Sequence, residues 1–226
     1  MDEAAAFAPR ITRPTWIMAH RQTGARGRQG RTWEMPEGNL GATLVYRPAC
    51  TPAEAARRSF VAANALYAAL AHFIDRDALA LKWPNDVLLN GGKVAGILLE
   101  SAGGGPFVER LSVGVGVNLA TAPADTGQPF RPVSLADQGG EVPDPLDFLT
   151  ILADCYATQE SVLDRLGFRR VRDDWLSRAA RLGEVITART AERVVQGIFD
   201  TVDDEGNLVL ITGSGPRAIP AAEVYF

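Results

Sequence analysis

The chain has few of the residues that metal centres and disulfide frameworks need. Of its 226 residues, only Cys50 and Cys155 are cysteine and only His20 and His72 are histidine. Because these histidines and cysteines are so few and so widely spaced, we expect no metal site built from them. With no secretory leader ahead of them, the two cysteines are interpreted as free thiols in a reducing cytosol, which predicts a cytoplasmic protein.

The chain also lacks a long hydrophobic run and an excess of positive charge. No apolar segment approaches the roughly 18 residues that a membrane helix needs, so no membrane partner is expected. The net charge of −4 and the pI near 5.3 argue against DNA as a partner. What remains is an ordinary globular composition, 46% hydrophobic and 22% charged. It is sufficient for one large core with a small satellite domain.

Residues 82–100 form the segment around which the rest of the chain is expected to fold. Apolar stretches flank Asn90-Gly91, and this pair is the strongest short hairpin signal because a type I′ turn needs positive φ at both central residues. Lys82 and Asp86 precede the turn and Lys93 follows it. These charges are either solvated strand ends or parts of a site, and the hairpin pattern leaves both interpretations open.

Residues 20–33 concentrate positive charge in an otherwise acidic chain. Arg26, Arg28 and Arg31 alternate with glycines. Glycine lets backbone N–H groups curl around an anion, and arginine forks match carboxylate and phosphate oxygens. We therefore predict an anion-binding loop that is mobile until an anion is bound; the alternative is a flexible, solvated basic loop.

Hydrophobic periodicity predicts alternating strands and helices around these two segments. The predicted strands are 16–19, 39–46, 78–83, 94–99 and 109–119, and the predicted helices are 52–73, 145–166 and 168–180. Residues 121–145 are interpreted as a long loop with a brief turn at 134–139. From residue 183 the pattern changes to short strands at 184–189, 193–202, 208–211 and 217–219, which predicts a small β-barrel.

The sequence contains no set of residues typical of nucleophilic hydrolysis, zinc chemistry or a P-loop. A cationic site with few proton-transfer groups instead suits chemistry between two anions. When a carboxylate attacks the α-phosphate of ATP, catalysis depends mainly on charge cancellation and positioning, with Mg²⁺ on the phosphates.

Four motifs together closely resemble the biotin protein ligases over residues 15–226. They are Gly24-Ala-Arg-Gly-Arg-Gln-Gly-Arg-Thr-Trp33, Lys82-Trp-Pro-Asn-Asp86, Lys93-Val-Ala-Gly-Ile-Leu98 and Gly114-Val-Gly-Val-Asn118, followed by a C-terminal Gly-x-Val…Gly…Asp-x-x-Gly-x-Leu pattern. The resemblance implies an α+β fold. The larger domain would span residues 1–180 and contain a central mixed or antiparallel sheet with flanking helices. This is the class II aminoacyl-tRNA-synthetase-like fold of the biotin/lipoate ligase type. A small SH3-like barrel would span residues 181–226.

The resemblance also implies a reaction in two steps. Biotin and MgATP give biotinyl-5′-AMP and pyrophosphate, and the biotinyl group then passes to a lysine of a biotin carboxyl carrier domain of acetyl-CoA carboxylase or a related carboxylase. The implied substrates and cofactors are therefore biotin, ATP and Mg²⁺. The resemblance is compatible with a homodimer.

Site residues are transferred from the family position by position. The expected catalytic residues are Lys93, Arg28 and Asp86, with Lys93 meeting the biotin carboxylate and the α-phosphate. Biotin contacts are expected from Gln22, Arg26, Gly27, Arg28, Lys93, Gly96, Gly114 and Gly116. ATP contacts are expected from Arg28, Arg31, Trp33, Lys82, Asn85 and Asn118. Asp86 is the expected Mg²⁺ ligand and a candidate to hydrogen-bond the acceptor amine.

The sequence departs from the family pattern in two places. A winged-helix DNA-binding domain would not fit ahead of Trp16, so autorepression through DNA is not expected. The Ser-Thr pair that contacts the biotin ring in the family has no match here, and residues 1–6 resemble the start of the helix that follows that pair. We therefore expect the chain to begin inside the domain. Two other functions stay open: a lipoate ligase of the same superfamily and a non-catalytic binding protein.

Overall fold

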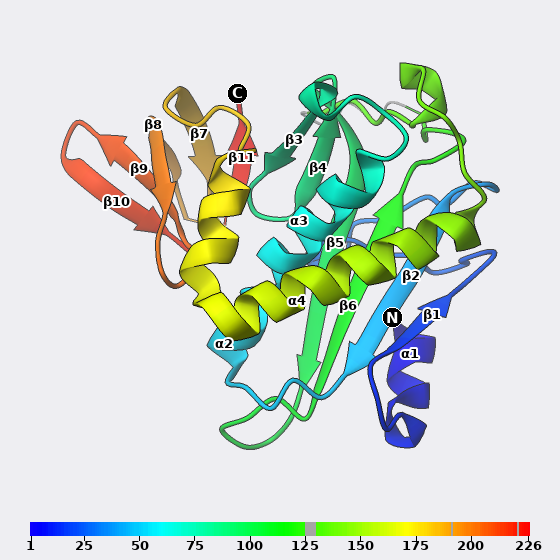
Figure 1. Cartoon of the computed structure of the whole chain (residues 1–226). Coiled ribbons are helices and arrows are strands. Elements are labelled where there is room, and N and C mark those ends of the chain that lie inside the picture. The colour runs from blue at the N-terminus through cyan, green and yellow to red at the C-terminus, as the bar shows by residue number, and fades with distance from the viewer. Residues whose placement is uncertain (125–129, 191, 221) are drawn as a thin grey trace.

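The computed structural model describes residues 1–124, 130–190, 192–220 and 222–226, and its strands form two separate sheets (Figure 1). The larger sheet has the order β1-β2-β6-β5-β4-β3. Its strands are β1 (Thr15–Met18), β2 (Leu40–Tyr46), β3 (Leu79–Lys82), β4 (Asp86–Leu89), β5 (Gly92–Ala102) and β6 (Arg110–Val117). Every strand pairing within it is antiparallel, so the expected α+β fold with an antiparallel central sheet is confirmed.

Two helices, α3 (Arg58–Leu70) and α4 (Pro145–Leu176), cover one face of the larger sheet (Figure 1). Alternate residues of β6, such as Val113 and Val115, point toward these helices and are buried in the core. The residues between them, Gly114 and Gly116, consequently face the opposite side. That side is partly covered by α1 (Asp2–Phe7), which contacts β2.

Both long helical predictions differ from the structure in detail. The predicted helix 52–73 is divided at Arg57 into α2 (Pro52–Ala56) and α3, and it ends at Leu70. The capping box of Thr51 and Glu54 is present at its start. The break predicted between two helices at Gly167 is confirmed as a kink within α4, where φ is 76° and ψ is 173°, but the second helical part ends at Leu176 rather than at residue 180. The kink occurs there because only glycine adopts this conformation without strain.

The segment expected to lie at the centre of the fold is a three-stranded meander, β3-β4-β5. Asn90 and Gly91 have φ values of 48° and 77°, which confirms the predicted turn between β4 and β5. A second tight turn at residues 83–85 joins β3 to β4, and its Trp83-Pro84 peptide bond is cis. This turn sets Lys82 directly opposite Asp86 in the strand register.

The smaller sheet has the order β10-β9-β8-β7-β11. It consists of β7 (Val185–Arg189), β8 (Val194–Val202), β9 (Leu208–Thr212), β10 (Gly215–Ile219) and β11 (Glu223–Tyr225). This antiparallel sheet agrees with the expected SH3-like barrel, although β11 was not predicted because three residues are too few to show a period. The boundary between residues 180 and 181 stays a prediction.

The smaller sheet packs closely on the helices of the larger unit. Trp175 of α4 lies between Phe60 of α3 and Phe199 of β8, with ring centroids 5.3 and 6.5 Å away. In addition, the Trp83 indole N–H donates a hydrogen bond of 3.1 Å to the Gly206 carbonyl in the turn between β8 and β9. The β-rich tail therefore contacts the turn next to Lys82 directly.

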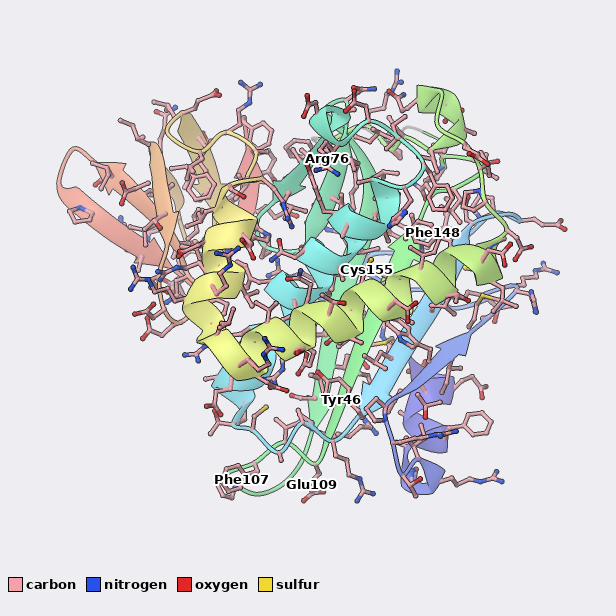
Figure 2. The ribbon with its side chains drawn as sticks, viewed as in Figure 1. Tyr46, Arg76, Phe107, Glu109, Phe148 and Cys155 are labelled. Atoms are coloured by element: carbon pink, nitrogen blue, oxygen red, sulfur yellow. The ribbon has the colours of Figure 1, made fainter. Side chains whose placement is uncertain are left out.

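A buried polar cluster holds α4 against the end of β2. The Tyr46 and Tyr156 hydroxyls lie 3.1 Å apart, and Arg58 pairs with Glu160 at 2.9 Å (Figure 2, where Tyr46 is labelled). Arg58 also donates to the sulfur of Cys50. Cys50 and Cys155 are both free, as the composition predicted.

Candidate functional site

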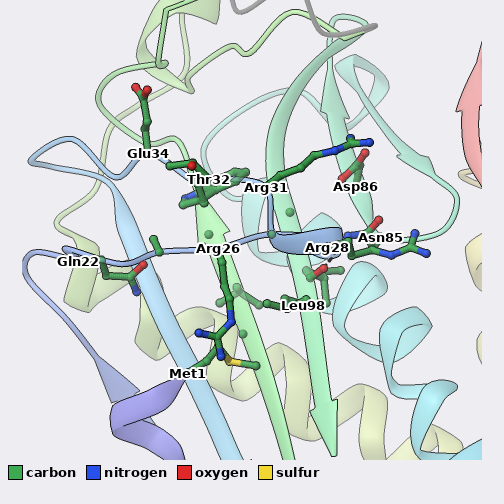
Figure 3. Close-up of a pocket in the computed structure, with 18 of the residues that line it drawn as sticks. Met1, Gln22, Arg26, Arg28, Arg31, Thr32, Glu34, Asn85, Asp86 and Leu98 are labelled. Carbon is green, nitrogen blue, oxygen red and sulfur yellow. Dashed lines mark hydrogen bonds between the residues drawn. The ribbon is translucent and has the colours of Figure 1, made fainter.

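A cleft of about 830 Å³ lies on the glycine-bearing face of the larger sheet. Its walls come from the basic loop, the turn between β3 and β4, the glycine positions of β5 and β6, and residues 222–224 of the tail. Figure 3 shows the basic loop crossing in front of the strands. The sheet supplies a rigid floor, and the two loops and the tail supply the charged rim.

One carboxylate in this cleft is shared by two ammonium groups. Lys82 Nζ lies 3.0 Å from Asp86 Oδ2, and Lys93 Nζ lies 2.6 Å from Asp86 Oδ1. The side chains of Lys82 and Asp86 are only 8% and 10% exposed, whereas Lys93 is 30% exposed. The interpretation of these charges as solvated strand ends is therefore wrong, because they form a largely buried cluster that opens to the cleft at Lys93.

The charges of this cluster shift one another's pKa values. Burial alone would raise the pKa of the Asp86 carboxyl, but the Lys82 and Lys93 ammoniums outweigh burial and hold that pKa below its ordinary value. Burial lowers the pKa of the Lys82 ammonium, and Asp86 opposes the shift. Lys82 and Lys93 are also the only lysines of the whole chain.

The arginines of the basic loop point in different directions. Arg26 pairs with Asp2 at 2.7 Å and with Glu100 at 3.0 Å, and Figure 3 shows its side chain turned toward Met1. Arg31 extends toward Asp86 in the same view and forms an ion pair with Glu223 of β11. The loop is thus tied to both ends of the described chain.

Arg28 begins the short helix η2 (Arg28–Gly30) in the middle of this loop. Its side chain reaches toward Asn85 (Figure 3). Burial lowers the pKa of the Arg28 guanidinium, and Arg31 adds to this shift while Asp86 opposes it. Within the loop, the Gly27 amide donates to the Arg31 carbonyl and the Trp33 amide to the Ala25 carbonyl. Arg28 and Arg31 therefore carry their charge to the side of the cleft where the lysine cluster lies.

Side chains of this protein cover the bare glycine backbone in the cleft. The Trp33 indole lies over Gly116, where an added Cβ would be 2.6 Å from its Nε1, and over Gly96, where an added Cβ would be 3.2 Å from the ring. Met1 lies over Gly114 in the same way, and its sulfur accepts a hydrogen bond from Thr43. The glycines are thus required for close approach, here by Trp33 and Met1.

The structure brings most of the predicted site residues together. The cleft lining includes Gln22, Arg26, Gly27, Arg28, Arg31, Trp33, Lys82, Asn85, Asp86, Lys93, Gly96, Gly114 and Gly116. Asn85 also fixes the turn, because its side-chain amide donates to the Ile97 carbonyl at 2.6 Å.

Asn118 is the exception among the predicted nucleotide contacts. It is buried at the end of β6 and is not part of the cleft lining. Its side-chain amide donates to the Val133 carbonyl, and its backbone carbonyl accepts from the Leu135 amide. Asn118 therefore anchors the segment that follows residue 130, and the structure does not bring it to the cleft.

Several cleft residues were missed from the sequence. Glu223 was missed because β11 was not predicted. Phe130 was missed because residues 121–145 were interpreted as a loop without site residues; its ring lies 4.5 Å from Lys82 Nζ and 4.7 Å from the ring of Phe226. Residues 125–129 of that predicted loop lie outside the described residues. The only sequence signal that could have indicated Phe130 was its aromatic side chain beside a proline-rich segment.

The predicted Mg²⁺ role of Asp86 does not fit the observed contacts. Both oxygens of this carboxylate already face ammonium groups. Within the described ranges, no group of three or more histidine, cysteine or acidic residues is arranged to hold a metal ion. This part of the chain also contains no helix long and apolar enough to span a membrane.

Comparisons with known proteins agree on one family. Residues 7–118 match the biotin/lipoate A/B protein ligase family, and residues 182–226 match the biotin protein ligase C terminal domain. The chain is 51% identical to a biotin–[acetyl-CoA-carboxylase] ligase of Paracoccus denitrificans, with 99% of this chain and 95% of that protein aligned. It is 31% identical to the bifunctional ligase/repressor BirA of Bacillus subtilis, of which it covers 65%.

Solved structures share the fold. A biotin protein ligase from Aquifex aeolicus, in complex with biotin and ATP, superposes with a TM-score of 0.79 at 24% identity, covering 95% of this chain and 89% of that one. A biotin protein ligase from Leishmania major, in complex with biotin, superposes with a TM-score of 0.66 at 22% identity, covering 96% and 93%.

Proposed function

This chain belongs to the biotin protein ligase family, and we infer that it is itself an ATP-dependent biotin–[biotin carboxyl-carrier protein] ligase. In the first step a biotin carboxylate oxygen attacks the α-phosphate of ATP, the bond to the β-phosphate breaks, and pyrophosphate leaves. In the second step the amine of a carrier lysine attacks the acyl carbon of biotinyl-5′-AMP, an amide forms, and AMP leaves.

The observation that carries this function is the convergence of cations on one cleft. Lys93, Lys82, Arg28 and Arg31 approach Asp86 from two separate segments of the chain. The attack of one anion on another is slowed by their repulsion, and cations already positioned around the reacting atoms reduce that repulsion. A cleft that binds a single neutral ligand would not need this arrangement.

We assign Lys93 as the residue that contacts the biotin carboxylate and the α-phosphate, since it is the more exposed of the two ammonium groups. Arg28 and Arg31 are assigned to contact the phosphates of ATP. Trp33 is assigned to contact the bound ligand above Gly96 and Gly116. Gln22, Arg26 and Gly27 stay the proposed biotin contacts.

Mg²⁺ is proposed to enter as the complex with the ATP phosphates rather than on Asp86, whose oxygens are engaged. The proposed partner is a biotin carboxyl carrier domain, and the proposed location is the cytoplasm, where its carboxylase would work. The homodimer and the lack of a DNA partner stay predictions.

Pyrophosphate release, measured with MgATP and each candidate acid in turn, tests which acid the protein activates. Release with biotin, and not with lipoate or octanoate, is expected, since the relative that is 51% identical and aligned over 95% of its own length is a biotin–[acetyl-CoA-carboxylase] ligase. Release with lipoate or octanoate alone would replace the proposal by a lipoate ligase, and no release with any of the three acids would favour a binding protein without turnover. Incorporation of biotin into an added carrier domain then tests the second step.

A further inference from the structure

The floor of the cleft is nearly bare of side chains on three adjacent strands. Six positions of β2, β6 and β5 lie in two cross-strand rows, and residues paired in this way point to the same face of a sheet. One row is Gly41, Gly116 and Gly96, and the other is Thr43, Gly114 and Leu98. Thr43 is therefore the one side chain of these six positions that can form a hydrogen bond.

The Thr43 hydroxyl has only a weak partner in the structure. Thr43 is 5% exposed and lines the cleft, and its hydroxyl donates to the Met1 sulfur at 3.5 Å. A thioether is a weak acceptor, and a methionine side chain adapts easily to its surroundings. A carbonyl oxygen brought into the cleft would be a better acceptor for this hydroxyl than Met1 is.

The position of Met1 marks a space that a ligand ring could take. The Met1 sulfur lies over Gly114, where an added Cβ would be 2.8 Å from it, and Gln22 lies over Gly41 in the neighbouring row (Figure 3). Movement of the flexible Met1 side chain would uncover Gly114 and the Thr43 hydroxyl together. The uncovered space would be bounded by an amide on one side and a hydroxyl on the other.

This space lies at a suitable distance from Lys93 for the far end of an extended acid. Lys93 Nζ would be 3.5 Å from a Cβ on Gly96, so a carboxylate bound by Lys93 lies above that glycine. Thr43 is two strands and two residues away from Gly96. Strand spacings of about 4.8 Å and rises of about 3.4 Å per residue make this span about 12 Å. Extended biotin, a five-carbon chain that carries a bicyclic ring, has a comparable length.

We propose that Thr43 is a specificity-determining residue that donates a hydrogen bond to the ureido carbonyl of biotin once the Met1 side chain has moved aside. This inference rests on the proposed function. Lipoate and octanoate have no carbonyl at the end opposite their carboxylate, so they would leave the buried hydroxyl without a good acceptor. A site built to hydrogen-bond one substrate rejects analogues that lack the matching group.

A second hydroxyl on the same face is less suited to this role. Ser112 lies one cross-strand pair further along, opposite Val45, and its buried Oγ has no hydrogen-bond partner among the described residues. However, Ser112 is only 1% exposed and is not part of the cleft lining. Thr43 is the hydroxyl that a ligand in the cleft can reach.

The test measures ligand binding without ATP, by isothermal titration calorimetry with biotin and with dethiobiotin. Dethiobiotin keeps the ureido group and lacks the ring sulfur. Thr43→Val replaces the hydroxyl by a methyl group of similar size, and it is expected to raise the Kd of both ligands about tenfold. Thr43→Ser keeps the hydroxyl, and its Kd values should stay within about threefold of the wild-type values.

Two further variants separate recognition from general effects on the protein. Thr43→Ala removes the hydroxyl without adding a methyl group in its place, and it should weaken binding as Thr43→Val does. Thr158→Val removes an exposed hydroxyl on α4 that donates to the Asp154 carbonyl, and it should keep the wild-type Kd values. Urea unfolding of each variant shows that the proteins compared are folded.

Three results would overturn the role of Thr43. They are a wild-type Kd for biotin in Thr43→Val or Thr43→Ala, an equal loss in Thr43→Ser, and a loss for biotin that dethiobiotin does not share. The last result would indicate a contact with the ring sulfur. Failure of the proposed function is seen separately, as a wild-type protein that binds biotin but releases no pyrophosphate with MgATP, and the Kd comparison would then still decide the role of Thr43.

Discussion

Removal of the Trp83 indole N–H should show whether the β-rich tail positions the lysine cluster. Trp83 is 3% exposed and lies in the turn between Lys82 and Asp86. Its indole donates to the Gly206 carbonyl at 3.1 Å. The substitution Trp83→Phe keeps an aromatic ring in the turn, but it removes the donor and leaves the Gly206 carbonyl without this partner.

The structure allows the cost of this substitution to be estimated. Loss of a hydrogen bond with one partner left unsatisfied costs about 1–3 kcal/mol, and the smaller ring adds a further packing loss of about 1 kcal/mol. Two other bonds still hold the turn: Ser59 Oγ donates to the Pro84 carbonyl at 3.0 Å, and Asn85 holds Ile97. The turn should therefore stay in place but hold Lys82 and Asp86 less precisely. We expect kcat for adenylate formation to fall about tenfold, which corresponds to a rise of about 1.4 kcal/mol in the activation free energy.

The matched control is Trp175→Phe. Trp175 is buried at the same junction, and among the described residues its ring contacts are with Phe60 and Phe199 and not with Trp83. Urea unfolding should report a loss of stability for both variants, larger in Trp83→Phe because that variant also loses a hydrogen bond, whereas pyrophosphate release should fall only in Trp83→Phe, with the KM for biotin unchanged. An equal loss of kcat in both variants, or unchanged kcat in Trp83→Phe, would refute the positioning role.

Three other substitutions are expected to have separate effects. Lys93→Ala should abolish adenylate formation and leave the circular dichroism spectrum unchanged, whereas Arg169→Ala, which removes a cation that is 85% exposed on α4, should keep wild-type pyrophosphate release. Gly116→Ala places a Cβ against the Trp33 ring and should raise the KM for the ligands without unfolding the protein, as KM and unfolding measurements would show. Burial raises the pKa of Tyr46 and of Tyr156. Because tyrosine in the unfolded chain ionises first, at about pH 10, the free energy of unfolding should fall as pH rises above that value. Tyr46→Phe should reduce this fall in urea titrations at alkaline pH, and an equal fall in that variant would contradict the prediction.

Local chemistry explains why much of the fold could be predicted. The Asn90-Gly91 turn and the capping box at Thr51 depend on residues adjacent in the chain, and both occur as predicted. The division at Arg57 and the three-residue strand β11 depend on packing between distant segments. Periodicity carries no information about that packing, so these features could not be predicted.

In the site, likewise, the sequence predicted which residues are present but not which of them pair with one another. The motifs identified the residues that meet in the cleft, yet they assigned Asp86 to Mg²⁺, whereas the structure pairs it with two ammonium groups. That pairing depends on the β3–β4 register, which sets Lys82 opposite Asp86, and on the irregularity between Val87 and Leu88, after which Lys93 returns beside them. A shift of one residue in either strand would turn one of these side chains to the helical face of the sheet. The charge balance of the cleft is therefore a property of the sheet register, and a motif that fixes residue types cannot reveal it.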